Sequence, residues 1–158
     1  MEVFEQEQFL PITREQAWEF FSRPRNLEKI TPPEMGFEIT SCRGEQVYEG
    51  QVIAYRVKVA PLVRLPWVSE IKAVVPGESF VDDQIVGPYR IWIHQHSFAD
   101  AEGGVLVKDL VHWQAPFEPL SWPVKVAFVR PKVAEIFAHR KEVLAAYFAE
   151  DGEFRRSS

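Results

Sequence analysis

The sequence has few of the features that mark disulfide-rich or membrane-spanning proteins. It contains one cysteine, Cys42, in 158 residues. A single cysteine excludes an internal disulfide and a metal site built from several cysteines. No stretch approaches the roughly 20 apolar residues of a membrane-spanning helix, so we expect no membrane span.

Basic clusters are also missing from most of the chain. The net charge is −5, and no basic cluster precedes the short "RRSS" at the C-terminal end. Because nucleic-acid phosphates require a concentrated basic face, we expect no nucleic-acid partner. The first residues, "MEVFEQEQFL", carry acids where a secretory signal carries bases followed by an apolar run. We therefore expect a cytoplasmic location.

What the sequence does have is material for one core. Hydrophobic residues make up 46% of the chain and aromatic residues 13%. A chain of this length and composition is typical of a single folded domain. Since there is no repeat, linker or low-complexity run, we predict one domain over residues 1–150, followed by a flexible tail over residues 151–158.

The predicted elements follow the order strand, two helices, six strands and one long helix. "TREQ", Thr13–Gln16, is a capping box that begins the first helix. A second short helix is expected over residues 26–30. From Gly36 onward, turn residues separate segments of alternating apolar and polar side chains, a pattern typical of an antiparallel sheet.

The C-terminal segment has the spacing of a long amphipathic helix. Its apolar residues are Val133, Ile136, Phe137, Leu144, Tyr147 and Phe148. Arg140, Lys141 and Glu142 interrupt them, and we expect these three on the outer side. The whole pattern predicts an α+β fold in which a curved antiparallel sheet of seven strands wraps around this helix. Where the two do not touch, a cavity is expected.

Polar residues gather on one side of the segment "GPYRIWIHQHSF", residues 87–98. In a strand, residues two apart point the same way, so Arg90, Trp92, His94, His96 and Phe98 form one ladder. The two aromatic rings indicate that this ladder faces inward. On the following strand, Lys108 prefers water, which directs Asp109 inward. The candidate ligand-binding residues are Asp82, Gln84, Arg90, Trp92, His94, His96, Asp109 and Phe137.

Three segments together resemble the helix-grip proteins of the SRPBCC superfamily, also called START-like or Bet v 1-like. They are "PITREQAWEFFSRPRNLEKITPP", "FVDDQIVGPYRIWIHQHSF" and "RPKVAEIFAHRKEVL". The patterns "NLxxITPP", "FxDxQxxGPYxxWxHxHxF" and "IFxxRxxxL" are similar to those of a bacterial branch. The resemblance implies the helix-grip fold and a small apolar or amphipathic ligand held between sheet and helix. It implies no catalytic residue.

Several functions are compatible with this sequence. The leading hypothesis is a protein that binds a hydrophobic, aromatic or lipid-like molecule with no cofactor. A homodimer is compatible with it. The first alternative is a polyketide cyclase or dehydratase in which a His and an Asp act as acid and base. The second is a protein-interaction module with a filled cavity.

Two further interpretations concern the polar residues alone. They could satisfy one another in a buried network, with Asp82 on Arg90 and Asp109 on an imidazole. They could also form a metal site in which Asp82 or Asp109 completes a set with His94 and His96. Since no complete ligand spacing is present, we expect no metal.

Overall fold

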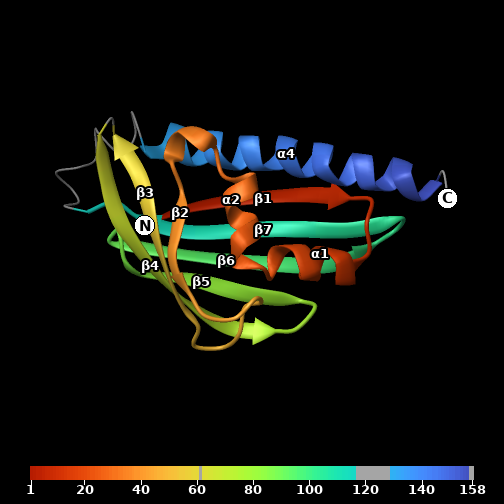
Figure 1. Ribbon diagram of the computed structural model, residues 1–158, viewed down its shortest axis with the longest axis horizontal. Helices are drawn as coiled ribbons and strands as arrows, with labels where there is room; N and C mark the ends of the chain where they lie inside the picture. The colour runs from red at the N-terminus through yellow and green to blue at the C-terminus, as the bar shows by residue number, and fades with distance from the viewer. Residues whose placement is uncertain (61, 117–128, 157–158) are drawn as a thin grey trace.

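A computed structural model describes residues 1–60, 62–116 and 129–156, and the side chains of residues 1–59, 62–116 and 129–149. Seven strands form one antiparallel sheet (Figure 1). They are β1 (Glu2–Leu10), β2 (Glu38–Cys42), β3 (Val52–Ala60), β4 (Val63–Val75), β5 (Ser79–Val86), β6 (Ile91–Ala101) and β7 (Gly104–Gln114). Their spatial order is β1-β7-β6-β5-β4-β3-β2, which confirms the predicted antiparallel sheet.

A short helical segment connects β1 to β2. It consists of α1 (Arg14–Phe21), η1 (Pro24–Asn26), α2 (Leu27–Ile30) and η2 (Pro33–Met35). The predicted capping box is present, because Thr13 Oγ1 accepts from the backbone N–H of Gln16 and the Gln16 side chain accepts from the backbone N–H of Thr13. Helices α1 and α2 confirm the two predicted helices.

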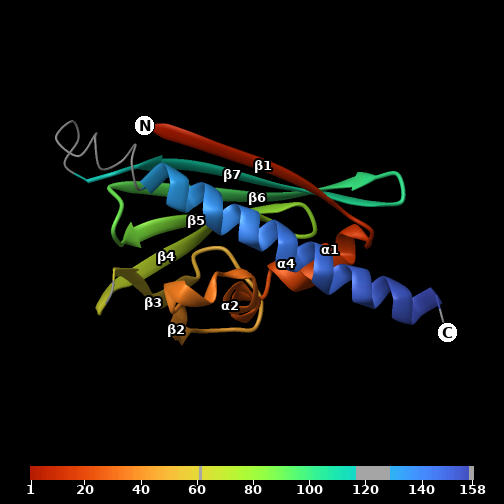
Figure 2. The ribbon, with the colours of Figure 1, turned by 90° about the horizontal axis from the view of Figure 1, so that it is seen from above.

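The long helix α4 (Arg130–Arg156) lies over the inner face of the sheet. Figure 2 shows it crossing the sheet, with β1 on one side and α2 and β2 on the other. Two glutamines on β1 hold it there: Gln6 donates to the carbonyl of Phe137 at 3.1 Å, and Gln8 donates to the carbonyl of Lys141 at 2.8 Å. Among the described residues, none of the helices is long and apolar enough to span a membrane.

Apolar side chains from the inner face of the sheet, α1 and α4 form the core. The most deeply buried include Leu10, Ile53, Ile71, Val105, Val111, Val133 and Leu144. Burying a side chain of this size contributes about 1.5–3 kcal/mol relative to leaving it exposed. On β7 the burial alternates strictly, with Val105, Val107, Asp109, Val111 and Trp113 inside. The predicted inner ladder of this strand is therefore confirmed.

The C-terminal helix differs from the prediction in two respects. Its backbone stays helical through Arg156, past residue 151 where the predicted tail begins. The flexibility of residues 151–158 and the single-domain division stay predictions. Arg140, expected on the outer side, is instead buried against the sheet. Arg140 lies on the same face of α4 as the buried residues Phe137 and Leu144, because it is three residues after the first and four before the second.

Candidate functional site

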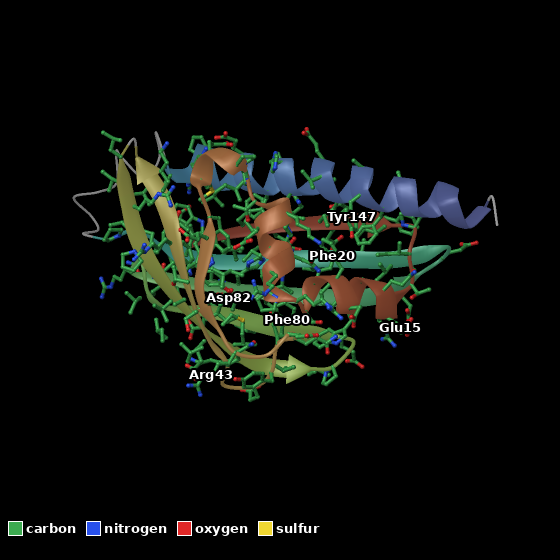
Figure 3. All side chains as sticks on the ribbon, in the orientation of Figure 1. Glu15, Phe20, Arg43, Phe80, Asp82 and Tyr147 are labelled. Carbon is green, nitrogen blue, oxygen red and sulfur yellow. The ribbon has the colours of Figure 1, made fainter. Side chains whose placement is uncertain are left out.

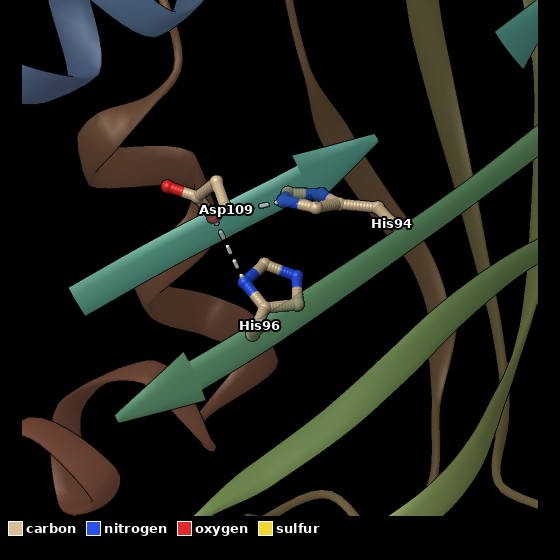
Figure 4. A group of neighbouring side chains, drawn as sticks. All are labelled: His94, His96 and Asp109. Carbon is tan, nitrogen blue, oxygen red and sulfur yellow. Dashed lines mark hydrogen bonds and ion pairs between the residues drawn. The ribbon is translucent and has the colours of Figure 1, made fainter. Parts of the chain in front are cut away.

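Four polar side chains from three elements meet inside the protein. His94 and His96 come from β6, Asp109 from β7 and Arg140 from α4. Adjacent strands bring the first three together, since His96 pairs directly with Asp109 in the sheet register. All four are buried: His94 is 7% exposed and His96 6%, and Asp109 and Arg140 are each 4% exposed. Figure 4 shows both imidazoles directed toward the Asp109 carboxylate.

One oxygen of Asp109 is the centre of this buried network. Oδ1 lies 2.8 Å from Nε2 of His94, 3.3 Å from Nδ1 of His96 and 3.2 Å from Nη2 of Arg140. An ionised carboxylate only accepts hydrogen bonds, so His94 donates through Nε2–H. The His96 Nδ1 atom also lies 3.4 Å from Arg140 Nη2. The predicted contact of Asp109 with an imidazole is confirmed.

The network holds its charges in a defined state. Burial opposes ionisation of Asp109, but the Arg140 guanidinium and the hydrogen bonds from the two imidazoles hold its pKa well below the ordinary value. Burial, and then the neighbouring His94, lower the pKa of His96 to about 3. At neutral pH His96 is therefore neutral, and Asp109 forms an ion pair with Arg140.

Two adjoining pockets lie beside the network. Their volumes are about 60 Å³ and 110 Å³. Both are lined by Leu27, Ile30, Tyr55, Asp82, His94 and Arg140. They therefore lie between the sheet, α2 and α4, where the sequence predicts a cavity.

Aromatic rings form much of the wall of the larger pocket. Trp67 and Trp92 pack edge to face with ring centroids 5.4 Å apart, and Tyr89 lies 4.7 Å from Trp92. Phe137 adds a ring from α4. Flat, rigid rings of this kind bury apolar ligand surface at little cost in side-chain entropy.

Asp82 supplies an acidic group to both pockets. It lies on the inner side of β5, beside the labelled Phe80 in Figure 3. Burial raises the pKa of Asp82, while a hydrogen bond from the Ser69 side chain opposes the shift. Trp67 Nε1 donates to Ser69 Oγ at 3.0 Å, so the Ser69 hydroxyl is free to donate onward. The Oδ1 atom of Asp82 is buried and has no hydrogen-bond partner within the described part of the chain.

Six of the eight predicted site residues lie around the pockets. Asp82, Trp92, His94, His96 and Phe137 line one or both, and Asp109 is held just behind them. Gln84 and Arg90 do not join them. Gln84 donates instead to the Tyr89 carbonyl at 2.7 Å, and thereby braces the turn before β6. Arg90 is exposed in that turn, so its predicted inward direction and its pairing with Asp82 are wrong.

Several pocket positions are not predicted from the sequence, among them Trp67, Tyr89 and Arg140. The alternation of side chains along the predicted strand directs Tyr89 outward. Strand β6 begins only at Ile91, so this alternation does not extend to Tyr89. Arg140 was assigned to the outer side because it is charged. Its helical spacing from Phe137 and the need of a buried Asp109 for a cation were the available signals.

The donor types for a metal ion are present, but the charge arrangement disfavours one. The ligand atoms of His94, His96 and Asp109 lie within 4.8 Å of one another. The guanidinium of Arg140 already contacts the same Asp109 oxygen that a cation would use. Since arginine stays protonated, a cation there would face an adjacent positive charge.

Comparisons with known proteins identify the fold. No family model matches the chain, and no curated protein matches its sequence. Protein Ms6760 from Mycobacterium smegmatis is similar in structure, with a TM-score of 0.69 and 15% identity over 94% of this chain and 92% of that one. Ara h 8.0201 has a TM-score of 0.59 and 17% identity over 92% of this chain and 98% of that one.

A third similar structure is a larger protein. It is the di-domain ARO/CYC StfQ from the steffimycin biosynthetic pathway, with a TM-score of 0.71 and 13% identity over 96% of this chain. The chain spans 51% of the length of StfQ. These similarities confirm the resemblance noted in the sequence at the level of the fold. The chain has the helix-grip fold, in which a curved antiparallel sheet of seven strands packs against a long C-terminal helix.

Proposed function

We propose that the chain binds a small, mainly apolar molecule in the two pockets between the sheet and helices α2 and α4. The supporting observation is that apolar and aromatic walls surround two buried polar atoms without a hydrogen-bond partner in the described residues, Oδ1 of Asp82 and Nε of Arg140. Leaving a buried polar atom unpaired costs about 1–3 kcal/mol. A ligand that supplies the missing partner recovers part of that cost.

The size of the pockets sets the size of the ligand. Pockets for drug-sized molecules usually measure about 300–1,000 Å³, whereas a cavity of about 150 Å³ accommodates benzene. Each of the two volumes here, 60 Å³ and 110 Å³, is below that size, so a single ring with a short polar substituent has to occupy both adjoining pockets together. A sterol or a long acyl chain would require α2 or α4 to move.

Blocking the pockets tests this function. Benzyl alcohol at ten times its dissociation constant is expected to stabilise the protein by about 1.4 kcal/mol. For a domain of this size the melting temperature then rises by about 3–5 °C. Leu27 lines both pockets, so Leu27→Trp should remove this increase. Lys29→Trp, an exposed change on the same short helix, is the control and should keep it.

The outcome is read by thermal unfolding with and without the probe. Loss of the shift in the Leu27 variant alone supports binding in the pockets. An equal shift in both variants, or no shift in the unmodified protein with any single-ring probe, contradicts the proposal.

Acid–base catalysis is a second candidate, favoured by the state of Asp82. Burial raises the pKa of this carboxyl, and its unpaired oxygen lines the pockets. A carboxyl in that condition can take a proton from a polyketone and return it during cyclisation or dehydration. The resemblance in fold to StfQ, an ARO/CYC, is compatible with this. Asp82→Asn should then abolish turnover of a β-polyketone probe while benzyl alcohol still binds; unchanged turnover contradicts it.

A further inference from the structure

The positive charge that borders the pockets is already matched. Arg140 lines both of them, and its guanidinium pairs with Asp109 at 3.2 Å. The other described cation at the smaller pocket, Arg23, is exposed and pairs with Glu19 and Glu45. Burial keeps His96 neutral, with a pKa of about 3. His94, which also lines both pockets, directs its Nε2 atom to Asp109 at 2.8 Å. An anionic ligand would therefore find no unpaired guanidinium among these residues.

An acid also lines both pockets. Asp82 has one carboxyl oxygen without a partner in the described residues, and that oxygen is buried. The Ser69 side chain already donates to this carboxyl. The free oxygen can accept a hydrogen bond from a ligand O–H or N–H group. A second carboxylate placed there would have to share a proton with Asp82 or meet a like charge at close range.

We propose that Asp82 makes these pockets selective for molecules that present a hydroxyl or amine donor, and that it excludes carboxylates of the same shape. This inference rests on the proposed binding function and names the ligand class for it. The ligand places its ring among Trp67, Trp92 and Phe137 and its donor on Oδ1 of Asp82. Specificity arises chiefly from the repulsive arrangement against anions, as in other charge-selective sites.

A pair of probes with the same ring tests the selectivity. Benzyl alcohol and benzoate are titrated at neutral pH into the full chain, with the indole N–H signals of Trp67 and Trp92 followed by NMR. We expect benzyl alcohol to bind at least about tenfold more tightly than benzoate, because two like charges placed side by side weaken binding.

The neighbouring acid on the same strand offers a matched control. Asp82→Asn keeps the shape and an acceptor but removes the charge, and should reduce the ratio of the two affinities to about threefold or less. Asp83 pairs with Lys72 at 2.7 Å, away from both pockets, so Asp83→Asn should leave the ratio unchanged. Neither variant removes the buried Asp109–Arg140 pair, so both should fold.

The outcomes separate this inference from the function on which it rests. Equal binding of benzyl alcohol and benzoate by the unmodified protein, or an unchanged ratio in Asp82→Asn, overturns the selectivity while binding stands. If neither probe shifts the two indole signals, both the selectivity and the proposed function are overturned.

Discussion

Replacing Arg140 with methionine is expected to lower the free energy of unfolding by about 3–5 kcal/mol. The reason is that Asp109 is only 4% exposed, so its ionised form needs favourable contacts. The Arg140 guanidinium is the largest of the contacts that lower the pKa of Asp109. Methionine fills a similar volume against the ring of Phe137 but leaves the buried carboxylate without its guanidinium partner. Urea unfolding at pH 7 measures the loss.

A double variant shows whether the pair is the cause. Asp109→Asn together with Arg140→Met removes both charges and should recover most of the stability lost in the single variant, because a buried pair is often replaced at little net cost. Lys141→Met, the exposed neighbour on α4, should change the free energy of unfolding by less than about 0.5 kcal/mol. A loss below about 1 kcal/mol for Arg140→Met contradicts the role of this ion pair.

Acid is expected to destabilise the protein well before ordinary carboxylates titrate. The folded chain holds the pKa of His96 at about 3, against 6.5 for an unperturbed imidazole. Between these values the unfolded chain binds a proton at this residue and the folded chain does not. The unfolding free energy therefore falls as the pH falls from 6.5 toward 3, by about 1.4 kcal/mol per pH unit for this one group.

Two buried carboxyls modify this dependence. Asp109 has a lowered pKa, so its stabilising contribution is present above pH 3.8 and is lost as the pH falls further. Asp82 acts in the opposite direction, because its raised pKa lets the folded chain bind a proton first. Because the contribution of Asp82 lies above pH 3.8 and opposes that of His96, a variant compared with the unmodified protein between pH 6.5 and 4.5 is needed to isolate His96.

The variant His96→Gln isolates this contribution. It should reduce the slope of unfolding free energy against pH in that window by about one proton, while His112→Gln, on the outer side of β7, should preserve the slope. Urea unfolding at several pH values gives the slopes. An identical slope in the unmodified protein and His96→Gln would show that His96 is not held neutral by the fold.

The fold was predictable from the sequence because its signals are local and repeated. The capping box at Thr13, the alternation along β7 and the helical spacing of Val133, Phe137 and Leu144 each predict one element. The order of those elements then permits few arrangements. The alternation of side chains along a strand is also a local signal, and it predicts the inward direction of His94, His96 and Asp109.

The errors in the predicted site have definite physical causes. Arg90 was placed inward by parity, yet parity holds only within a strand and β6 begins after it. Arg140 was placed outward because a lone arginine prefers water, a preference that a buried carboxylate on another element reverses. The first error depends on where the strand begins, and the second on a contact between segments far apart in the chain, which local patterns do not contain.

The most direct measurement is a crystal structure of the protein soaked with benzyl alcohol. We expect electron density for the ring between Trp92 and Phe137, with the hydroxyl oxygen about 2.5–3.0 Å from Oδ1 of Asp82. Pockets that stay empty of the probe at a saturating concentration, or a probe found only elsewhere on the molecule, would contradict binding between the sheet and α4.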